Sequence, residues 1–232
     1  MPTNLAGLVA RRFLAAGLGD GRPGVAGLNP TTLPRPAEQL AAARLHPRRP
    51  ATGPALAAAW RAALLAEPGV FSQVADHPAT VQGLVRAHRE LRDLDDDALD
   101  ALAMVPPLSA DLVRPHRAVR ARLRTGWFDQ TDLLHTATAS CTSQSAAALG
   151  TVVLYLPQAL TRAESGFVAA LATVAPLCTV AGLIGHPKAD AGECAAHADE
   201  ALQGATALRC PEGLRRQASP PGGVMTCIGR RK

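Results

Sequence analysis

Two stretches of similar sequence hold the residue types in this chain that are best suited to chemistry. Residues 84–92 read LVRAHRELR and residues 112–120 read LVRPHRAVR. Each stretch combines one histidine, His88 or His116, with a row of arginines. Three explanations follow from these residue types: an internal repeat, a metal site built on two imidazoles, or a basic surface that contacts DNA phosphates.

The spacing within both stretches is helical, and it places each histidine on or beside an apolar stripe. His88 follows Leu84 by one helical turn, as His116 follows Leu112. The arginines fall on another side of each helix, where nearby carboxylates weaken the case for phosphate contact. Because the spacing indicates no third or fourth ligand, we predict no metal site. The favoured interpretation is a half-buried histidine at the edge of the core, beside a solvated arginine face.

A second candidate is an acidic cluster at residues 93–100, which contains five aspartates and could bind a cation. The cluster lies between two predicted helices. Asp95, Asp96 and Asp97 fall at the start of the second helix, where the helix dipole favours negative charge. We therefore interpret the cluster as a helix start rather than as a cation site.

Motifs for catalysis are absent from the sequence. It contains no G-x-x-x-x-G-K-[ST] loop, no H-E-x-x-H and no G-x-S-x-G. A restriction-type nuclease needs Asp/Glu-x-Lys near a further carboxylate, and neither Lys188 nor Lys232, the only lysines, fits. Five scattered cysteines without a C-x-x-C pair argue against a disulfide framework or a zinc site. We therefore predict no catalytic residue, no metal and no cofactor in this chain.

The elements that must position these side chains follow from the periodicity of apolar residues. A helix is predicted over residues 4–16, and a loop rich in glycine and proline follows over 17–36. Pro78 and Asp95 are typical helix start signals. Further helices are predicted over about 36–44, 54–66, 78–92, 95–104, 108–124 and 129–139.

The pattern changes after Gly150. The run TVVLYL at 151–156 predicts a buried strand, Thr161 and Glu164 form a capping box at a helix start, and LCTVAGLIG at 177–185 predicts a second strand. A strand, a helix and a strand in this order predict a parallel βαβ unit. The fold class is therefore α/β and predominantly helical.

Composition and charge indicate the type of core and the cellular compartment. Hydrophobic residues make up 47% of the chain but aromatic residues only 3%, which is typical of a helix-rich core of alanine, leucine and valine. The net charge of +5 belongs to residues 204–232, which hold six basic residues against Glu212 and are predicted to be a disordered basic tail. Without a signal peptide or an apolar run of roughly 18–20 residues, we expect a cytoplasmic protein that does not contact a membrane.

Four patches resemble one protein family. The sequence PTNLA at 2–6 resembles the Thr-Asn-x-Ala motif of UvrD-type superfamily 1 helicases, and FDQTDLL at 128–134 is similar to their Phe-Asp-Asp-Leu-Leu helix. The segment at 151–171 sits where the second ATPase strand and its helix belong, and VAGLIGHP at 180–187 resembles the next strand and its turn. In this order the patches resemble the degenerate helicase-like N-terminal region of AddB-like, actinobacterial PD-(D/E)XK nuclease proteins.

The resemblance implies a partial P-loop-helicase-like parallel sheet with a large all-helical insertion. Its parts would be a core remnant at 1–35, the insertion at 36–145, a βαβ unit at 146–203 and the tail at 204–232. It also implies a role in DNA repair and recombination, DNA and a helicase subunit as partners, and contact of Thr3 and Asn4 with single-stranded DNA.

One departure from the family bears on activity. Leu156-Pro157-Gln158 replaces the Asp-Glu that holds Mg²⁺ in a helicase. The parent family is a helicase-like hydrolase and exonuclease. Because Walker A, Walker B and nuclease motifs are missing here, we expect a non-catalytic fragment, and whether the chain is an enzyme stays open. The alternative is a small α/β-helical interaction protein without a nucleic-acid role.

Overall fold

The computed structural model describes residues 4–16, 27–105, 108–155 and 160–180 of the chain. The contacts divide the chain into two compact units, which are described separately. The helical unit comprises residues 41–139 and 161–166, and the second unit comprises residues 1–40, 140–160 and 167–232. The predicted division of the sequence into four parts stays a prediction.

The described residues are predominantly helical, as predicted. The α-helices are α1 (Asn4–Ala15), α2 (Pro34–Leu45), α3 (Gly53–Ala66), α4 (Pro78–Leu91), α5 (Asp96–Ala103), α6 (Leu108–Leu123), α7 (Gln130–Ser140), α8 (Ser143–Ala147) and α9 (Arg162–Val174). A short 3-10 helix, η1, spans Gly69–Phe71. The strands are β1 (Arg49–Pro50), β2 (Trp127–Phe128), β3 (Val152–Tyr155) and β4 (Leu177–Val180).

The sequence patterns locate most of these helices to within two residues, because their start signals act as expected. Asp95 caps α5 by accepting a hydrogen bond from the backbone N–H of Ala98 at 2.8 Å. Pro78 occupies the first turn of α4, where its missing N–H is not needed. The periodicity missed α8, η1 and the short pair β1 and β2, which are too brief to show a pattern.

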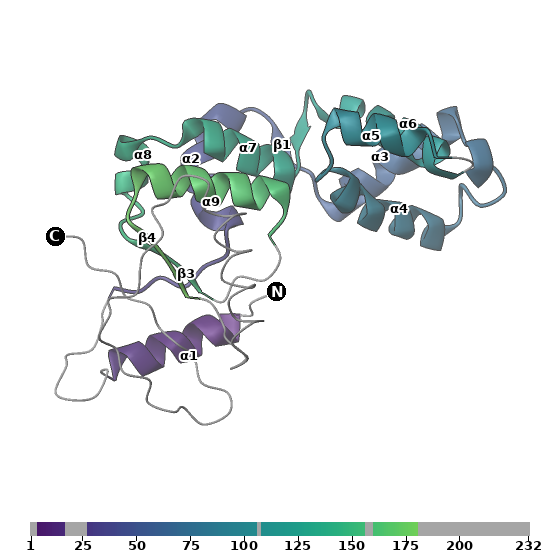
Figure 1. The fold of residues 1–232 in the computed structure, drawn as a ribbon. Coiled ribbons are helices and arrows are strands. Elements are labelled where there is room, and N and C mark those ends of the chain that lie inside the picture. The colour runs from purple at the N-terminus through teal and green to yellow at the C-terminus, as the bar shows by residue number, and fades with distance from the viewer. Residues whose placement is uncertain (1–3, 17–26, 106–107, 156–159, 181–232) are drawn as a thin grey trace, which may run out of the picture. The chain divides into compact units, whose positions relative to one another are not determined.

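The predicted parallel pair is present in β3 and β4, which are joined through α9 (Figure 1). Their register runs from Val152 opposite Leu177 to Tyr155 opposite Val180. The second predicted strand continued to residue 185, and its part beyond residue 180 lies outside the described residues, as do the predicted basic tail and the turn at 181–187.

The predicted capping box at the start of α9 is also present. The backbone N–H of Thr161 donates to Glu164 Oε2 at 3.0 Å, and the backbone N–H of Glu164 donates to Thr161 Oγ1 at 3.2 Å. Both orphan amides of this helix start are therefore satisfied by side chains.

The core of the helical unit lies between α3, α4 and α6 (Figure 1). Trp60 of α3 is fully buried at its centre, where it meets apolar side chains of the other two helices. A smaller cluster of Leu91, Leu99 and Val113 attaches α5 to this core. Burial of such side chains stabilises the unit by roughly 1.5–3 kcal/mol for each large residue. Among the described helices, none combines the length and the apolar character that a membrane span requires.

Candidate functional site

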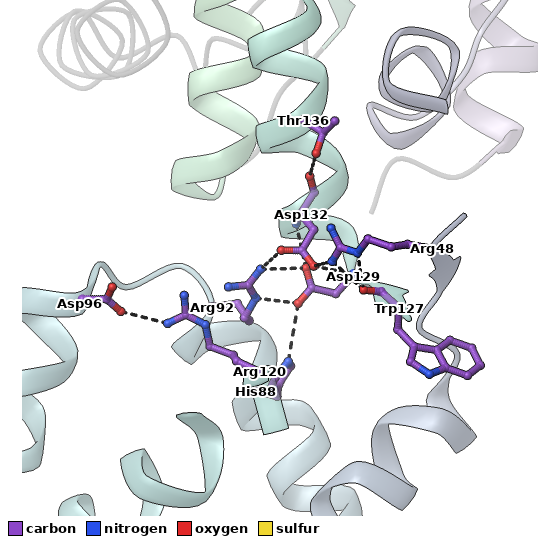
Figure 2. A network of polar contacts seen from close by, with 9 residues as sticks. All are labelled: Arg48, His88, Arg92, Asp96, Arg120, Trp127, Asp129, Asp132 and Thr136. Carbon is purple, nitrogen blue, oxygen red and sulfur yellow. Dashed lines mark hydrogen bonds and ion pairs between the residues drawn. The ribbon is translucent and has the colours of Figure 1, made fainter. Parts of the chain in front are cut away.

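Two carboxylates at the start of α7 form the centre of a polar network in the helical unit (Figure 2). The backbone N–H of Asp132 donates to Asp129 Oδ1 at 2.8 Å, and the backbone N–H of Asp129 donates to Asp132 Oδ2 at 3.3 Å. This reciprocal pair caps α7 in the manner of a capping box. The FDQTDLL stretch thus places both carboxylates at one helix start, where two arginines reach them.

Arg92, at the end of α4, bridges both carboxylates. Its Nε donates to Asp129 Oδ2 at 2.6 Å and its Nη2 donates to Asp132 Oδ1 at 2.5 Å. Its side chain is only 10% exposed, so solvent screens these pairs weakly. Burial alone would raise the pKa of Asp129, but the nearby His88 and Arg92 outweigh it and hold that pKa well below its usual range.

Arg48, which follows α2, binds the network from the other side. Its Nη2 donates to Asp132 Oδ2 at 2.8 Å. The same guanidinium donates to the backbone carbonyl of Trp127, from Nε at 2.8 Å and from Nη2 at 2.6 Å. Arg48 therefore connects the cap of α7 to the backbone of β2.

The two histidines singled out from the sequence meet in the core of this unit. The centroids of their rings are 4.8 Å apart, and the ring of Trp60 lies 6.0 Å from His88 and 6.4 Å from His116. The prediction that they are half-buried at the core edge is wrong, because their exposed fractions are 2% and 0%. The helices α4 and α6 face each other through these stripes, so each histidine covers the other.

The buried histidine rings have almost no polar partners. None of their four nitrogens makes a hydrogen bond within the described residues. His88 Nε2 lies 3.7 Å from Asp129 Oδ2, which is an ion-pair distance rather than a hydrogen bond. Burial, followed by the neighbouring His88, Arg120 and Arg92, lowers the pKa of His116 to about 3. The neutral imidazole is therefore the form that this core accommodates.

The arginine row of the second stretch is neutralised by carboxylates. Arg117 pairs with Asp100 at 2.6 Å and Arg120 pairs with Asp96 at 3.0 Å. Arg114 likewise contacts Asp111 and Glu67, each at 2.8 Å. In the first stretch, Arg86 and Arg89 are exposed, and neither makes an ion pair with a described residue. These pairings neutralise Arg114, Arg117 and Arg120, which reduces their attraction for phosphates.

The acidic cluster behaves as a helix start, as interpreted. Besides capping α5, Asp95 pairs through Oδ2 with Arg162 Nη1 at 2.5 Å. Asp93 Oδ1 accepts a hydrogen bond from the backbone N–H of Arg162 at 2.6 Å. The backbone N–H of Ala98, then Arg162, lowers the pKa of Asp95. Among the described residues, no three histidine, cysteine or acidic side chains are grouped so that they could hold a metal ion.

The residues predicted to contact DNA lie at the edge of what is described. Thr3 is outside the described residues, and Asn4 is the first residue of α1, with a side chain that is not described. The Leu156-Pro157-Gln158 stretch also lies outside the described residues.

Comparisons with known proteins give no match for this chain: no family model, no curated protein and no solved structure is similar to it. The function is therefore inferred from the local geometry of the chain. In that geometry, both central carboxylates are occupied by arginines and none is left to act as a base or a ligand.

The network instead holds Trp127 in place. Its indole points away from the carboxylates (Figure 2) and lines a shallow groove of about 410 Å³ beside α3. Sequence reasoning did not select Trp127 or Arg48. The Asp-x-x-Asp spacing at the start of α7 could have indicated the cap. No local signal identifies Arg48, because it lies more than 80 residues away in sequence from Asp132.

Proposed function

We propose that this chain is a non-catalytic, DNA-contacting part of an AddB-like helicase–nuclease protein that processes DNA ends in repair and recombination. The observation that carries the proposal is the parallel β3–α9–β4 unit, which follows a helical unit in the order that the family resemblance requires. The capped α7, which begins at the FDQTDLL stretch, is a second element that supports it.

The proposal includes the absence of ATP hydrolysis by this chain. A helicase needs a carboxylate pair at the end of its second ATPase strand to hold Mg²⁺. Here that position reads Leu156-Pro157-Gln158, and these side chains cannot replace it. The purified chain is therefore expected to release no phosphate from ATP in the presence of single-stranded DNA, and DNA-stimulated release would overturn this part of the proposal.

DNA contact is tested by fluorescence anisotropy of a labelled single-stranded oligonucleotide over a series of salt concentrations. The expected result is an affinity that falls as salt rises, because bound arginines and lysines displace counterions. The double variant Thr3→Ala and Asn4→Ala is expected to weaken binding. If binding disappears only when residues 204–232 are deleted, the basic tail alone is responsible and the proposal fails.

One observation favours the alternative of an interaction protein without a nucleic-acid role. The arginines at 114, 117 and 120 are all paired with carboxylates, which reduces their attraction for phosphates. Met104, at the end of α5, is 82% exposed and Leu65, on α3, is 73% exposed. Anisotropy that stays flat at low salt would favour this alternative over the DNA-contacting role.

A further inference from the structure

The groove beside Trp127 is formed by α3, the end of α6 and β2, all within the helical unit. On α3 the groove is lined by alanines, whose small side chains leave space beside Trp127, and Trp127 itself is partly buried and packs against the core cluster. The residues that line the groove are Ala55, Ala58, Ala59, Ala62, Arg122, Leu123 and Trp127.

The backbone that carries Trp127 is fixed on both sides. Arg48 donates two hydrogen bonds to its carbonyl. On the neighbouring strand, the N–H of Arg49 donates to the carbonyl of Gly126 at 2.9 Å and the N–H of Ala51 donates to that of Phe128 at 2.7 Å. The indole is thus presented on a rigid support, which lowers the entropy lost when a ligand binds.

One unpaired arginine lines this groove, and three more lie near its lining residues in register or in sequence. Arg122 lines the groove, and Arg49 lies opposite Trp127 in the register of β1 and β2. Arg61 is next to Ala62 on α3, and Arg124 directly follows the lining residue Leu123. All four arginines are exposed, and none makes an ion pair with a described residue. None of the lining residues is acidic.

We propose that this groove binds single-stranded nucleic acid, with one base stacked on the indole of Trp127 and the adjoining phosphates on Arg122 and Arg49. An aromatic platform beside unpaired arginines is the combination that such ligands use, because every base has a flat face and every linkage a negative charge. The site rests on the proposed DNA-contacting function and names a contact separate from Thr3 and Asn4. It differs from the paired arginine row of α6, where carboxylates already occupy the guanidinium groups.

The test follows two signals with the full-length chain and a labelled oligothymidylate. Anisotropy of the label reports any binding to the chain, and tryptophan fluorescence reports contact in the groove. Trp60 is fully buried, so quenching on binding is expected to come from Trp127. Trp127→Phe keeps an aromatic face, so it should keep most of the affinity while the quenching disappears. Trp127→Ala is expected to weaken binding about tenfold.

Charge is tested with a matched pair of exposed arginines. Arg122→Ala is expected to reduce the slope of log affinity against log salt by about one phosphate contact. Arg86→Ala removes the same charge from an exposed, unpaired position on α4 outside the groove lining, and it should leave the slope and the quenching unchanged. Circular dichroism checks that each variant keeps its helices.

The outcomes distinguish binding in the Trp127 groove from DNA contact elsewhere on the chain. Anisotropy that rises without quenching, and that responds equally to Arg122→Ala and Arg86→Ala, would overturn the groove while leaving DNA contact in place. Anisotropy that never rises would overturn both. Displacement of the oligonucleotide by polyglutamate, with quenching by polyglutamate as strong as by DNA, would assign the groove to acidic peptides and overturn the nucleic-acid assignment.

Discussion

The imidazole rings of His88 and His116 lie 4.8 Å apart, one on α4 and one on α6, and both are buried within the core of the helical unit. The charged groups that face this pair are Arg92 directly after α4, Arg120 on α6 and Asp129 before α7, while α3 contributes the uncharged Trp60. A proton added to His116 must enter a region with two cations and one carboxylate, which is already paired.

We predict that acid destabilises the helical unit through His116. Its pKa is about 3 in the folded chain, against an ordinary value of 6.5 for a solvated histidine, so the unfolded chain binds the extra proton between these values. The contribution of neutral His116 to the free energy of unfolding is complete above about pH 6.5 and is lost as the pH falls towards 3. The free energy of unfolding should decrease by up to about 1.4 kcal/mol per pH unit in this window, as measured by urea denaturation.

The control for this pH dependence is His116→Leu. Leucine has no proton to bind, so the variant should lose this part of the slope between pH 6 and about pH 4.5. His135→Leu, at an exposed position on α7, is the matched control for replacing a histidine by leucine outside the core. Equal slopes for the native chain and His116→Leu would contradict the role of this residue.

Asp129→Asn is predicted to destabilise the chain by roughly 3 kcal/mol, because it leaves the nearly buried Arg92 without its main partner. Asp100→Asn breaks the exposed pair with Arg117 and is predicted to change stability by less than about 1 kcal/mol. Denaturation midpoints at neutral pH compare the two variants. Similar effects would mean that the network contributes no more than a surface ion pair.

Two glycines are predicted to respond in opposite directions to alanine. Gly69 has a φ of +52°, and a Cβ there would lie 2.5 Å from Asp111 Oδ2, the atom that accepts the N–H of Val70. Gly69→Ala should destabilise the chain by about 1 kcal/mol or more. Gly83 is within α4, with open space around its Cβ position, so Gly83→Ala should stabilise it by roughly 0.5–1 kcal/mol. Thermal unfolding distinguishes the signs.

Loss of the capping box is predicted to weaken the start of α9. Thr161→Ala removes the acceptor for the N–H of Glu164 and should destabilise the helix by about 0.5–2 kcal/mol. Thr173→Ala, near the exposed end of the same helix, removes only a bond to its own preceding turn and should have a smaller effect. Hydrogen exchange at the amides of the first turn checks the difference, and unchanged protection in Thr161→Ala would count against the cap.

Local signals were sufficient for most helices, because caps and apolar stripes depend on residues within one or two turns. Asp95, Pro78 and the pair of Thr161 and Glu164 act where the sequence places them. The parallel pairing of β3 and β4 also followed from their apolar runs and the helix between them.

Contacts between residues that are far apart in sequence could not be predicted from these local signals. Periodicity placed His88 and His116 on apolar stripes, but it could not show that the two stripes face each other and bury both rings. Nothing near Arg48 indicates that it reaches Asp132 and the carbonyl of Trp127. The candidate groove depends on these contacts, and so its aromatic residue could be recognised only from the folded arrangement.

The attachment of Arg162 to Asp93 and Asp95 bears on the order in which the chain can fold during synthesis. Residues 161–166 complete the helical unit, yet they are made after the intervening segment at 140–160. When Ala139 leaves the ribosome, both aspartates still lack the partner that they have in the finished structure. The last step in assembling the helical unit must therefore wait until the ribosome has passed the capping box of α9.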